Sequence, residues 1–195
     1  TGTFNPNTKI WTGPTLPYLY SPDYYFSDFM FEKYDEDPKR VLQVCVDDGT
    51  ELTSEELKLS SIRVAQNLIK SGVKPNDVIT MITHQSHMTT SLINGAIFCG
   101  ALINPLDAQF DEKDIRAVCE NTKPRIIICD PEVIPKVQNS LNGVNFIYRI
   151  YTTTSDESSK YLRAVDLLKP TNEEEKFVPL KFEETADEKV LAIMC

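Results

Sequence analysis

Short apolar runs alternate with amphipathic segments over the middle of the chain, and this alternation is the feature that most limits its fold. The runs have the length of strands, and the sequence between them carries apolar residues at helical spacing. Strands separated by helices favour a parallel sheet covered by helices, which is an α/β fold. The predicted strands are 78–82, 101–103, 125–129 and 146–151, and the predicted helices include 88–97, 111–119 and 133–141.

The segment before this region predicts a strap, a helix and a hairpin. Residues 1–40 carry an irregular strap, expected to lie across a larger body, and a helix over about 24–34 that begins after the N-cap candidate Ser21 and turns its aromatic residues toward a core. Residues 41–52 predict a hairpin with an Asp47-Asp48-Gly49 turn. The two carboxylates could also suggest a metal or phospho-acceptor site, but no helix N-terminus follows them, so the turn is the favoured interpretation.

A long helix is predicted after the hairpin, with a recognisable signal at each end. Thr53 and Glu56 have the spacing of a capping box, in which each side chain bonds the backbone N–H of the other residue. Gly72 stands where a left-handed residue ends many helices. Both ends of this helix are therefore predicted by local chemistry.

Charge and cysteine usage narrow the class of protein. The 20 Lys and Arg residues against 29 Asp and Glu residues give a net charge of −9, which would repel a nucleic-acid backbone or an anionic membrane surface. No apolar stretch approaches the length that spans a bilayer. The cysteines form no CxxC pair and mostly lie in apolar runs, which favours reduced, buried thiols in an intracellular compartment. They are Cys45, Cys99, Cys119, Cys129 and Cys195.

A search for catalytic or ligand-binding motifs finds none that is specific. The seven glycines form neither GxGxxG nor GxxxxGK[ST], and close helix packing explains Gly95 and Gly100 better than phosphate binding does. His84 and His87 follow the strand 78–82, at the edge where open α/β sheets bind ligands, yet no Glu or Cys accompanies them at a metal-ligand spacing. Exposed polar histidines are the favoured interpretation. No GxSxG elbow is present either, and we assign no catalytic, cofactor-binding or metal-binding residue from the sequence.

The pattern loosens after residue 151 and ends in another apolar run. Residues 152–182 contain a short amphipathic piece near 161–168 and the run Glu173-Glu174-Glu175, which we interpret as a solvated face or loop. Lys189–Cys195 has the continuous apolar character of a central parallel strand buried on both faces. We therefore expect the chain to be the front part of a larger α/β protein.

Four passages, taken in order, resemble the N-terminal region of the adenylate-forming enzymes, the family of acyl-CoA synthetases, 4-coumarate-CoA ligases and firefly-luciferase-like proteins. The first is similar to the family's LTYxEL motif, the second to its G-(V/I)-x-(P/K)-G-D-x-V passage, the third to its GAxxxGAxxxP stretch, and the fourth to the strand leading into its phosphate loop. They are Glu51–Leu57, Ser71–Val78, Asn94–Pro105, and Phe177–Pro179 with Asp187–Met194. Ser54, Asn76 and the pair Leu106-Asp107 depart from the family pattern, which leaves the subfamily open.

This resemblance implies an enzyme that uses ATP and Mg²⁺ to convert a carboxylic acid into an acyl-adenylate and then passes the acyl group to coenzyme A. Luciferase-like relatives instead oxidise the adenylate. Residues 1–195 would be the N-terminal portion of the AMP-binding domain, ending before the phosphate loop that follows the strand Val190–Cys195 in the family. The segment alone is then expected to be inactive, with the rest of the polypeptide and a small carboxylic acid as its partners. The family also implies fatty-acid metabolism and a location in the peroxisome or cytoplasm.

Two other classes of protein stay open at this point. The chain could be a complete, non-catalytic α/β module that acts by binding another protein. It could also be a nicotinamide-dependent oxidoreductase domain, although the missing glycine fingerprint argues against that class.

Overall fold

The computed structural model describes residues 2–14, 20–46, 49–84 and 86–194. Its centre is a five-stranded parallel sheet with the strand order β6-β5-β7-β8-β9. The α/β fold predicted from the alternation is therefore confirmed, although the predicted strand 146–151 begins three residues later, at Arg149. The strands are β5 (Val78–Ile82), β6 (Leu102–Pro105), β7 (Ile126–Cys129), β8 (Arg149–Thr152) and β9 (Leu162–Arg163).

The central strands β5 and β7 are buried along their whole length. Successive residues of a strand point to opposite faces of a sheet, so a strand covered on both faces needs apolar residues at nearly every position. The residues of β7 divide accordingly. Ile126 and Ile128 belong to one hydrophobic cluster, and Ile127 and Cys129 belong to a second cluster on the other face. The sheet thus lies between two separate cores.

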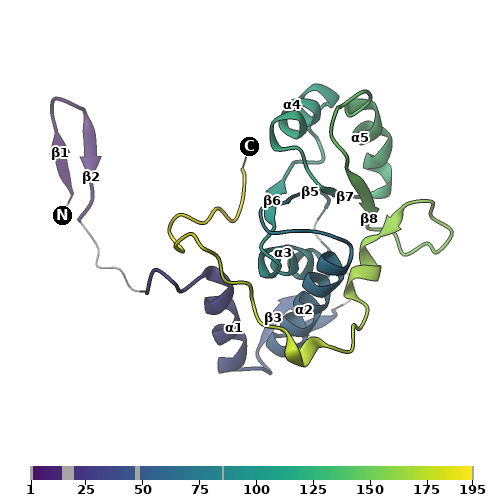
Figure 1. The fold of residues 1–195 in the computed structure, drawn as a ribbon, viewed down its shortest axis with the longest axis horizontal. Coiled ribbons are helices and arrows are strands. Elements are labelled where there is room, and N and C mark those ends of the chain that lie inside the picture. The colour runs from purple at the N-terminus through teal and green to yellow at the C-terminus, as the bar shows by residue number, and fades with distance from the viewer. Residues whose placement is uncertain (1, 15–19, 47–48, 85, 195) are drawn as a thin grey trace.

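Each core is closed by a pair of helices (Figure 1). One face of the sheet is covered by α2 (Ser54–Lys70) and α3 (Thr89–Phe98), and the other by α4 (Glu112–Thr122) and α5 (Ile134–Ser140), which follows a 3-10 turn over Pro131–Val133. The helices α2 and α3 pack directly on one another as well as on the sheet. Two further 3-10 turns, Ala164–Leu168 and Glu174–Lys176, pack against α2.

Both ends of α2 and the start of α4 follow the local chemistry predicted for them. The Thr53 side chain accepts the backbone N–H of Glu56, and the Glu56 carboxylate accepts the backbone N–H of Thr53 at 2.9 Å, so the capping box is confirmed. Gly72 has a φ of 89°, the left-handed conformation expected at the end of α2. Asp111 caps α4 by accepting the backbone N–H groups of Lys113 and Asp114.

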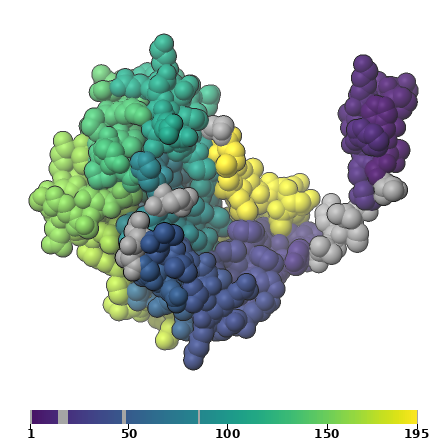
Figure 2. Space-filling model, turned by 180° about the vertical axis from the view of Figure 1, so that it is seen from behind, coloured from purple at the N-terminus to yellow at the C-terminus, as the bar shows by residue number. Residues whose placement is uncertain are grey.

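The region before α2 differs in part from the prediction. A hairpin of β1 (Thr3–Asn5) and β2 (Ile10–Thr12) replaces the expected strap, and it stands apart from the body in Figures 1 and 2. The first helix, α1 (Phe26–Glu36), begins later than Tyr24, because the chain first turns between Ser21 and Tyr24, and Asp28 then accepts the backbone N–H of Tyr25 at 2.9 Å. Phe26 is 42% exposed, so its predicted role in a core is wrong.

The second hairpin agrees with the prediction. Strands β3 (Val41–Val44) and β4 (Glu51–Thr53) pair antiparallel, and Gly49 has a φ of 72° in the turn between them. Asp47 and Asp48 lie outside the described residues.

The final apolar run is not the buried central strand that its composition predicts. It makes one parallel bridge, between Ala192 and Ile103 of β6, and it lies outside β6 at the edge of the sheet. Val190 is 52% exposed and Met194 is 74% exposed, and Figure 2 shows this C-terminal segment on the surface. An edge position leaves one flank without a neighbouring strand among the described residues, which explains the exposure. Cys195 lies outside the described residues.

In the acidic run at 173–175, Glu173 and Glu175 are exposed as predicted, but Glu174 is not. Glu174 forms an ion pair with Arg63 of α2 at 2.9 Å, and its side chain is only 13% exposed. Its carboxylate also accepts the backbone N–H of Thr171 at 2.9 Å. Glu174 therefore connects the 3-10 turn Glu174–Lys176 to α2.

Candidate functional site

The carboxyl ends of β5, β7 and β8 bring polar side chains together at one edge of the sheet. All strands of a parallel sheet end at the same edge, which is where open α/β sheets bind ligands. His84 lies two residues beyond β5, Asp130 directly follows β7, and Thr153 directly follows β8. Residues far apart in the sequence thus become neighbours.

Asp130 is the centre of this group. Its side chain is 12% exposed, and one of its oxygens, Oδ2, accepts the backbone N–H of His84 at 2.7 Å and lies 2.8 Å from Nδ1 of the same residue. The other oxygen, Oδ1, accepts the hydroxyl of Thr153 at 2.5 Å. Both carboxylate oxygens are therefore held, and Asp130 in turn fixes the backbone after β5.

Glu132 completes a three-residue cluster. Its Oε1 lies 3.7 Å from the Nδ1 of His84, and the candidate ligand atoms of His84, Asp130 and Glu132 all lie within 4.8 Å of one another. No Glu or Cys lies at a metal-ligand spacing from His84 in the sequence, but the fold brings these two carboxylates beside it from the end of another strand. The sequence did contain one signal for this cluster. Asp130 directly follows a buried strand, and the carboxyl ends of parallel strands lie at the same edge of a sheet, so Asp130 and His84 could be expected on one edge.

His87 does not belong to this cluster. It lies beside an open groove of about 570 Å³ between the β3-β4 hairpin and the start of α3. Gln43 of β3 donates to the carbonyl of His87 at 3.3 Å, and Thr90 donates its hydroxyl proton to Gln43 at 3.0 Å. The two histidines are both exposed, as predicted, and they lie in separate regions.

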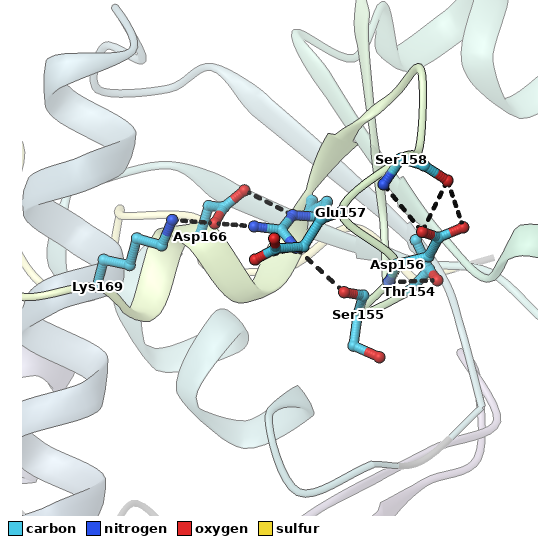
Figure 3. Close-up of polar contacts among 8 residues, drawn as sticks. Thr154, Ser155, Asp156, Glu157, Ser158, Asp166 and Lys169 are labelled. Carbon is cyan, nitrogen blue, oxygen red and sulfur yellow. Dashed lines mark hydrogen bonds and ion pairs between the residues drawn. The ribbon is translucent and has the colours of Figure 1, made fainter.

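Polar contacts connect the loop after β8 with the segment around Arg163 and Asp166 (Figure 3). The guanidinium of Arg163 donates to both carboxylate oxygens of Asp166, at 2.9 and 3.0 Å, and to the carbonyl of Ser155 at 3.1 Å. Hydrogen bonds from Arg163, followed by one from Lys169, hold the pKa of Asp166 below its ordinary value. Asp156 accepts the backbone N–H and the hydroxyl of Ser158. This loop and the start of α5 border a pocket of about 440 Å³.

The electrostatics of the described edge favour cations over phosphates. A phosphate binds well at a helix N-terminus whose N–H groups are free and whose first turn lacks acids. Here α4 begins with Asp111 on its amides and with Glu112 and Asp114 in the first turn, and the 3-10 turn after β7 begins with Asp130 and Glu132. The starts of α4 and of this 3-10 turn therefore do not fit the phosphates of ATP.

The cysteines and the glycine pair behave as structural residues. Cys99, Cys119 and Cys129 are buried, as predicted for core thiols, and burial raises the pKa of Cys99 and of Cys129 to about 12. Thiols of this kind are poor nucleophiles. Gly95 lies against α2, where any larger residue would meet Val64, so the packing interpretation of this glycine is confirmed.

A parallel sheet with helices on both faces places the chain among the α/β proteins, a class whose open sheets bind ligands at the carboxyl edge. The sequence matches the AMP-binding enzyme family over residues 31–194. The chain belongs to this family, the adenylate-forming enzymes that four of its sequence passages resemble.

Individual relatives cover different branches of the family. The chain is 32% identical over 111 residues to the cyclochlorotine synthetase of Talaromyces islandicus, which is 55% of this chain and 2% of that protein. It is 28% identical over 116 residues to the probable acyl-activating enzyme 21 of Arabidopsis thaliana, which is 57% of this chain and 21% of that protein. The luciferase-like enzyme of the nonluminescent mealworm Zophobas morio has a similar structure, with a TM-score of 0.77 and 25% identity over 87% of this chain and 39% of that one.

The chain therefore spans well under half the length of each of these three proteins. Among the described helices, none combines the length and the apolar character needed to cross a bilayer.

Proposed function

We propose that this chain is the N-terminal portion of the AMP-binding domain of an ATP-dependent, acid-activating ligase. In this reaction class a carboxylate displaces pyrophosphate from ATP to give an acyl-adenylate, and an acceptor thiol then displaces AMP to give a thioester. The observation that carries the proposal is the family match over residues 31–194. The similarity to the Zophobas morio luciferase-like enzyme over 87% of the chain also supports it.

Coenzyme A is the proposed acceptor, which makes the whole protein an acyl-CoA synthetase, and a fatty acid is the proposed kind of substrate. The name acyl-activating enzyme, carried by the Arabidopsis thaliana relative, agrees with this class. The name of the cyclochlorotine synthetase of Talaromyces islandicus does not mention acyl activation, so this relative does not support coenzyme A as the acceptor. The identity of the acceptor therefore needs a direct test. Mg²⁺ would accompany ATP, as it does in other ATP-dependent enzymes.

Within that enzyme, the proposed role of residues 1–195 is to supply part of the scaffold while other parts of the polypeptide hold ATP. The acidic start of α4 supports this role as scaffold. The carboxylates of Asp111, Glu112 and Asp114 would repel the negative charge of a triphosphate there. We assign no catalytic step to any residue of this segment.

Pyrophosphate exchange into ATP tests the activity. The complete product of the gene that encodes this chain should catalyse exchange that depends on an added fatty, aromatic or amino acid, and should form a thioester when coenzyme A is present. The absence of acid-dependent exchange across such a panel would refute the acid-activating ligase. Exchange without thioester formation would retain the adenylation and refute coenzyme A as the acceptor.

Residues 1–195 alone should give no exchange above the blank. Measurable exchange by this segment would refute its role as scaffold and leave the reaction class standing. A location in the peroxisome or cytoplasm is proposed with this function, and the buried Cys99 and Cys129, which form no disulfide, fit a reducing compartment. The family match gives no support to the alternative of a non-catalytic binding module.

A further inference from the structure

We propose that His84, Asp130 and Glu132 form a binding site for a divalent transition-metal ion of the zinc class. The site lies at the carboxyl edge of the sheet, between the end of β5 and the end of β7. It is proposed in addition to the Mg²⁺ that would accompany ATP, and it does not depend on the proposed ligase activity.

The distances between the three side chains fit one shared ion. Zinc binds His nitrogen and carboxylate oxygen at about 2.0–2.2 Å, so ligand atoms around a tetrahedral zinc lie about 3.4 Å apart. Nδ1 of His84 lies 2.8 Å from Oδ2 of Asp130 and 3.7 Å from Oε1 of Glu132, on either side of that value. All three ligand atoms fall within 4.8 Å of one another. Small rotations of the two exposed side chains would bring the atoms into place.

The central ligand is positioned in advance. Asp130 is buried, its Oδ1 accepts the Thr153 hydroxyl, and its Oδ2 also accepts the backbone N–H of His84. Hydrogen bonds of this kind orient the carboxylates of metal sites. The side chains of His84 and Glu132 are 71% and 66% exposed, so an ion can enter from solvent and keep water at its remaining positions.

The charges also call for a cation. A neutral imidazole carries one N–H, and Nδ1 can donate to only one acceptor. A hydrogen bond from His84 to Asp130 would explain that pair, but it leaves the Glu132 carboxylate 3.7 Å from the same nitrogen with no proton between them. Within the described part of the chain, neither carboxylate forms an ion pair with a lysine or arginine. A divalent ion would neutralise both carboxylates at once.

The ligand set indicates the kind of metal. One imidazole and two carboxylates are typical of Zn²⁺ and its first-row neighbours, whereas Mg²⁺ prefers an octahedral shell made of oxygen and water. The site should therefore bind Zn²⁺ in preference to Mg²⁺.

Calorimetric titration of the chelator-treated chain with Zn²⁺ and with Mg²⁺ tests the site. Wild type should bind one zinc ion per chain and should bind Mg²⁺ much more weakly. His84→Gln and Glu132→Gln should each weaken zinc binding by about tenfold or more. His87→Gln is the matched control, because His87 lies three residues away in a different groove, and this variant should bind zinc as wild type does.

Co²⁺ gives a second reading that reports the ligands directly. Bound Co²⁺ should give a visible absorption spectrum that His84→Gln abolishes and His87→Gln keeps. The change falls on an exposed side chain, and circular dichroism of each variant verifies the fold. Failure of the folded wild-type chain to bind zinc at millimolar concentration would overturn the proposal, as would unchanged zinc binding by His84→Gln or Mg²⁺ binding as tight as Zn²⁺ binding.

Discussion

Replacing Gly95 with alanine sets two physical effects of opposite sign against each other. Gly95 is a buried residue in the middle of α3, at the contact with α2. A Cβ at this position would lie 2.8 Å from the carbonyl oxygen of Ser61, compared with 3.4 Å for the shortest ordinary contact. It would lie still closer to the Cβ and Cγ1 of Val64. Helix propensity alone favours alanine, whereas packing opposes it.

The size of the effect follows from which atoms are in the way. The obstructing atoms are a backbone oxygen and the branched base of a valine, neither of which can move aside without shifting α2. Overpacking of this kind costs about 1–3 kcal/mol, and the upper part of that range applies to a rigid neighbour. The gain in helix propensity over glycine is about 1 kcal/mol. The net expectation for Gly95→Ala is a loss of about 2 kcal/mol, or about 4–8 °C in Tm for a chain of this size.

Urea unfolding followed by circular dichroism measures this loss. The unfolding midpoint of Gly95→Ala should fall while the dependence on urea concentration stays the same. A midpoint equal to or higher than that of wild type would show that helix propensity outweighs the contact and would refute the reasoning.

A double-mutant cycle provides the control. Val64→Ala removes one of the two obstructing carbon atoms, Cγ1, so it should cost less free energy of unfolding in the Gly95→Ala background than in wild type. Equal costs in the two backgrounds would show that the two residues do not press on each other.

Three further outcomes are expected. Asp111→Ala removes the cap of α4 and should lower the free energy of unfolding by about 1 kcal/mol. Asp111→Ser keeps a hydrogen-bond acceptor and should lower the free energy of unfolding by less. Equal decreases for the two variants would contradict the capping role. The pKa of Glu174 is lowered from 4.5 to about 2, mainly because its carboxylate accepts the backbone N–H of Thr171, so its stabilising effect is complete above the ordinary pKa and is lost as the pH falls toward 2. Urea midpoints measured down that pH range should fall more steeply for wild type than for Glu174→Gln, and parallel curves would count against this linkage. Iodoacetamide at about pH 8 should modify the half-buried Cys45 and should modify the buried Cys129 only after urea unfolds the chain. Mass spectrometry identifies the modified cysteines. Labelling of Cys129 in the folded chain would contradict its raised pKa.

Features that depend on residues close in the sequence could be predicted from it. The capping box of Thr53 and Glu56 is complete within one helical turn, so no distant contact is needed to form it. The burial of Ile126–Cys129 was predictable because its apolar run lies between helical segments, which limits it to a covered strand. The family resemblance likewise depends on the order of short local passages.

Burial of the final apolar run could not be predicted in the same way. Residues 190–194 are as apolar as β7, yet they are largely exposed because they lie outside β6. The difference comes from the strand order β6-β5-β7-β8-β9, in which β7 has a neighbour on each side. A run of apolar residues shows that burial would be favourable, but not which strands are present to provide it.

The candidate metal site separates the two kinds of information most clearly. The sequence placed His84 after a strand and Asp130 after another, 46 residues apart. Only the parallel pairing of β5 with β7, with Ile82 opposite Cys129, carries both residues to one edge at hydrogen-bond distance. The local sequence thus determined where each strand ends, and the tertiary structure decided which ends meet, because strand pairing depends on contacts that no single segment contains.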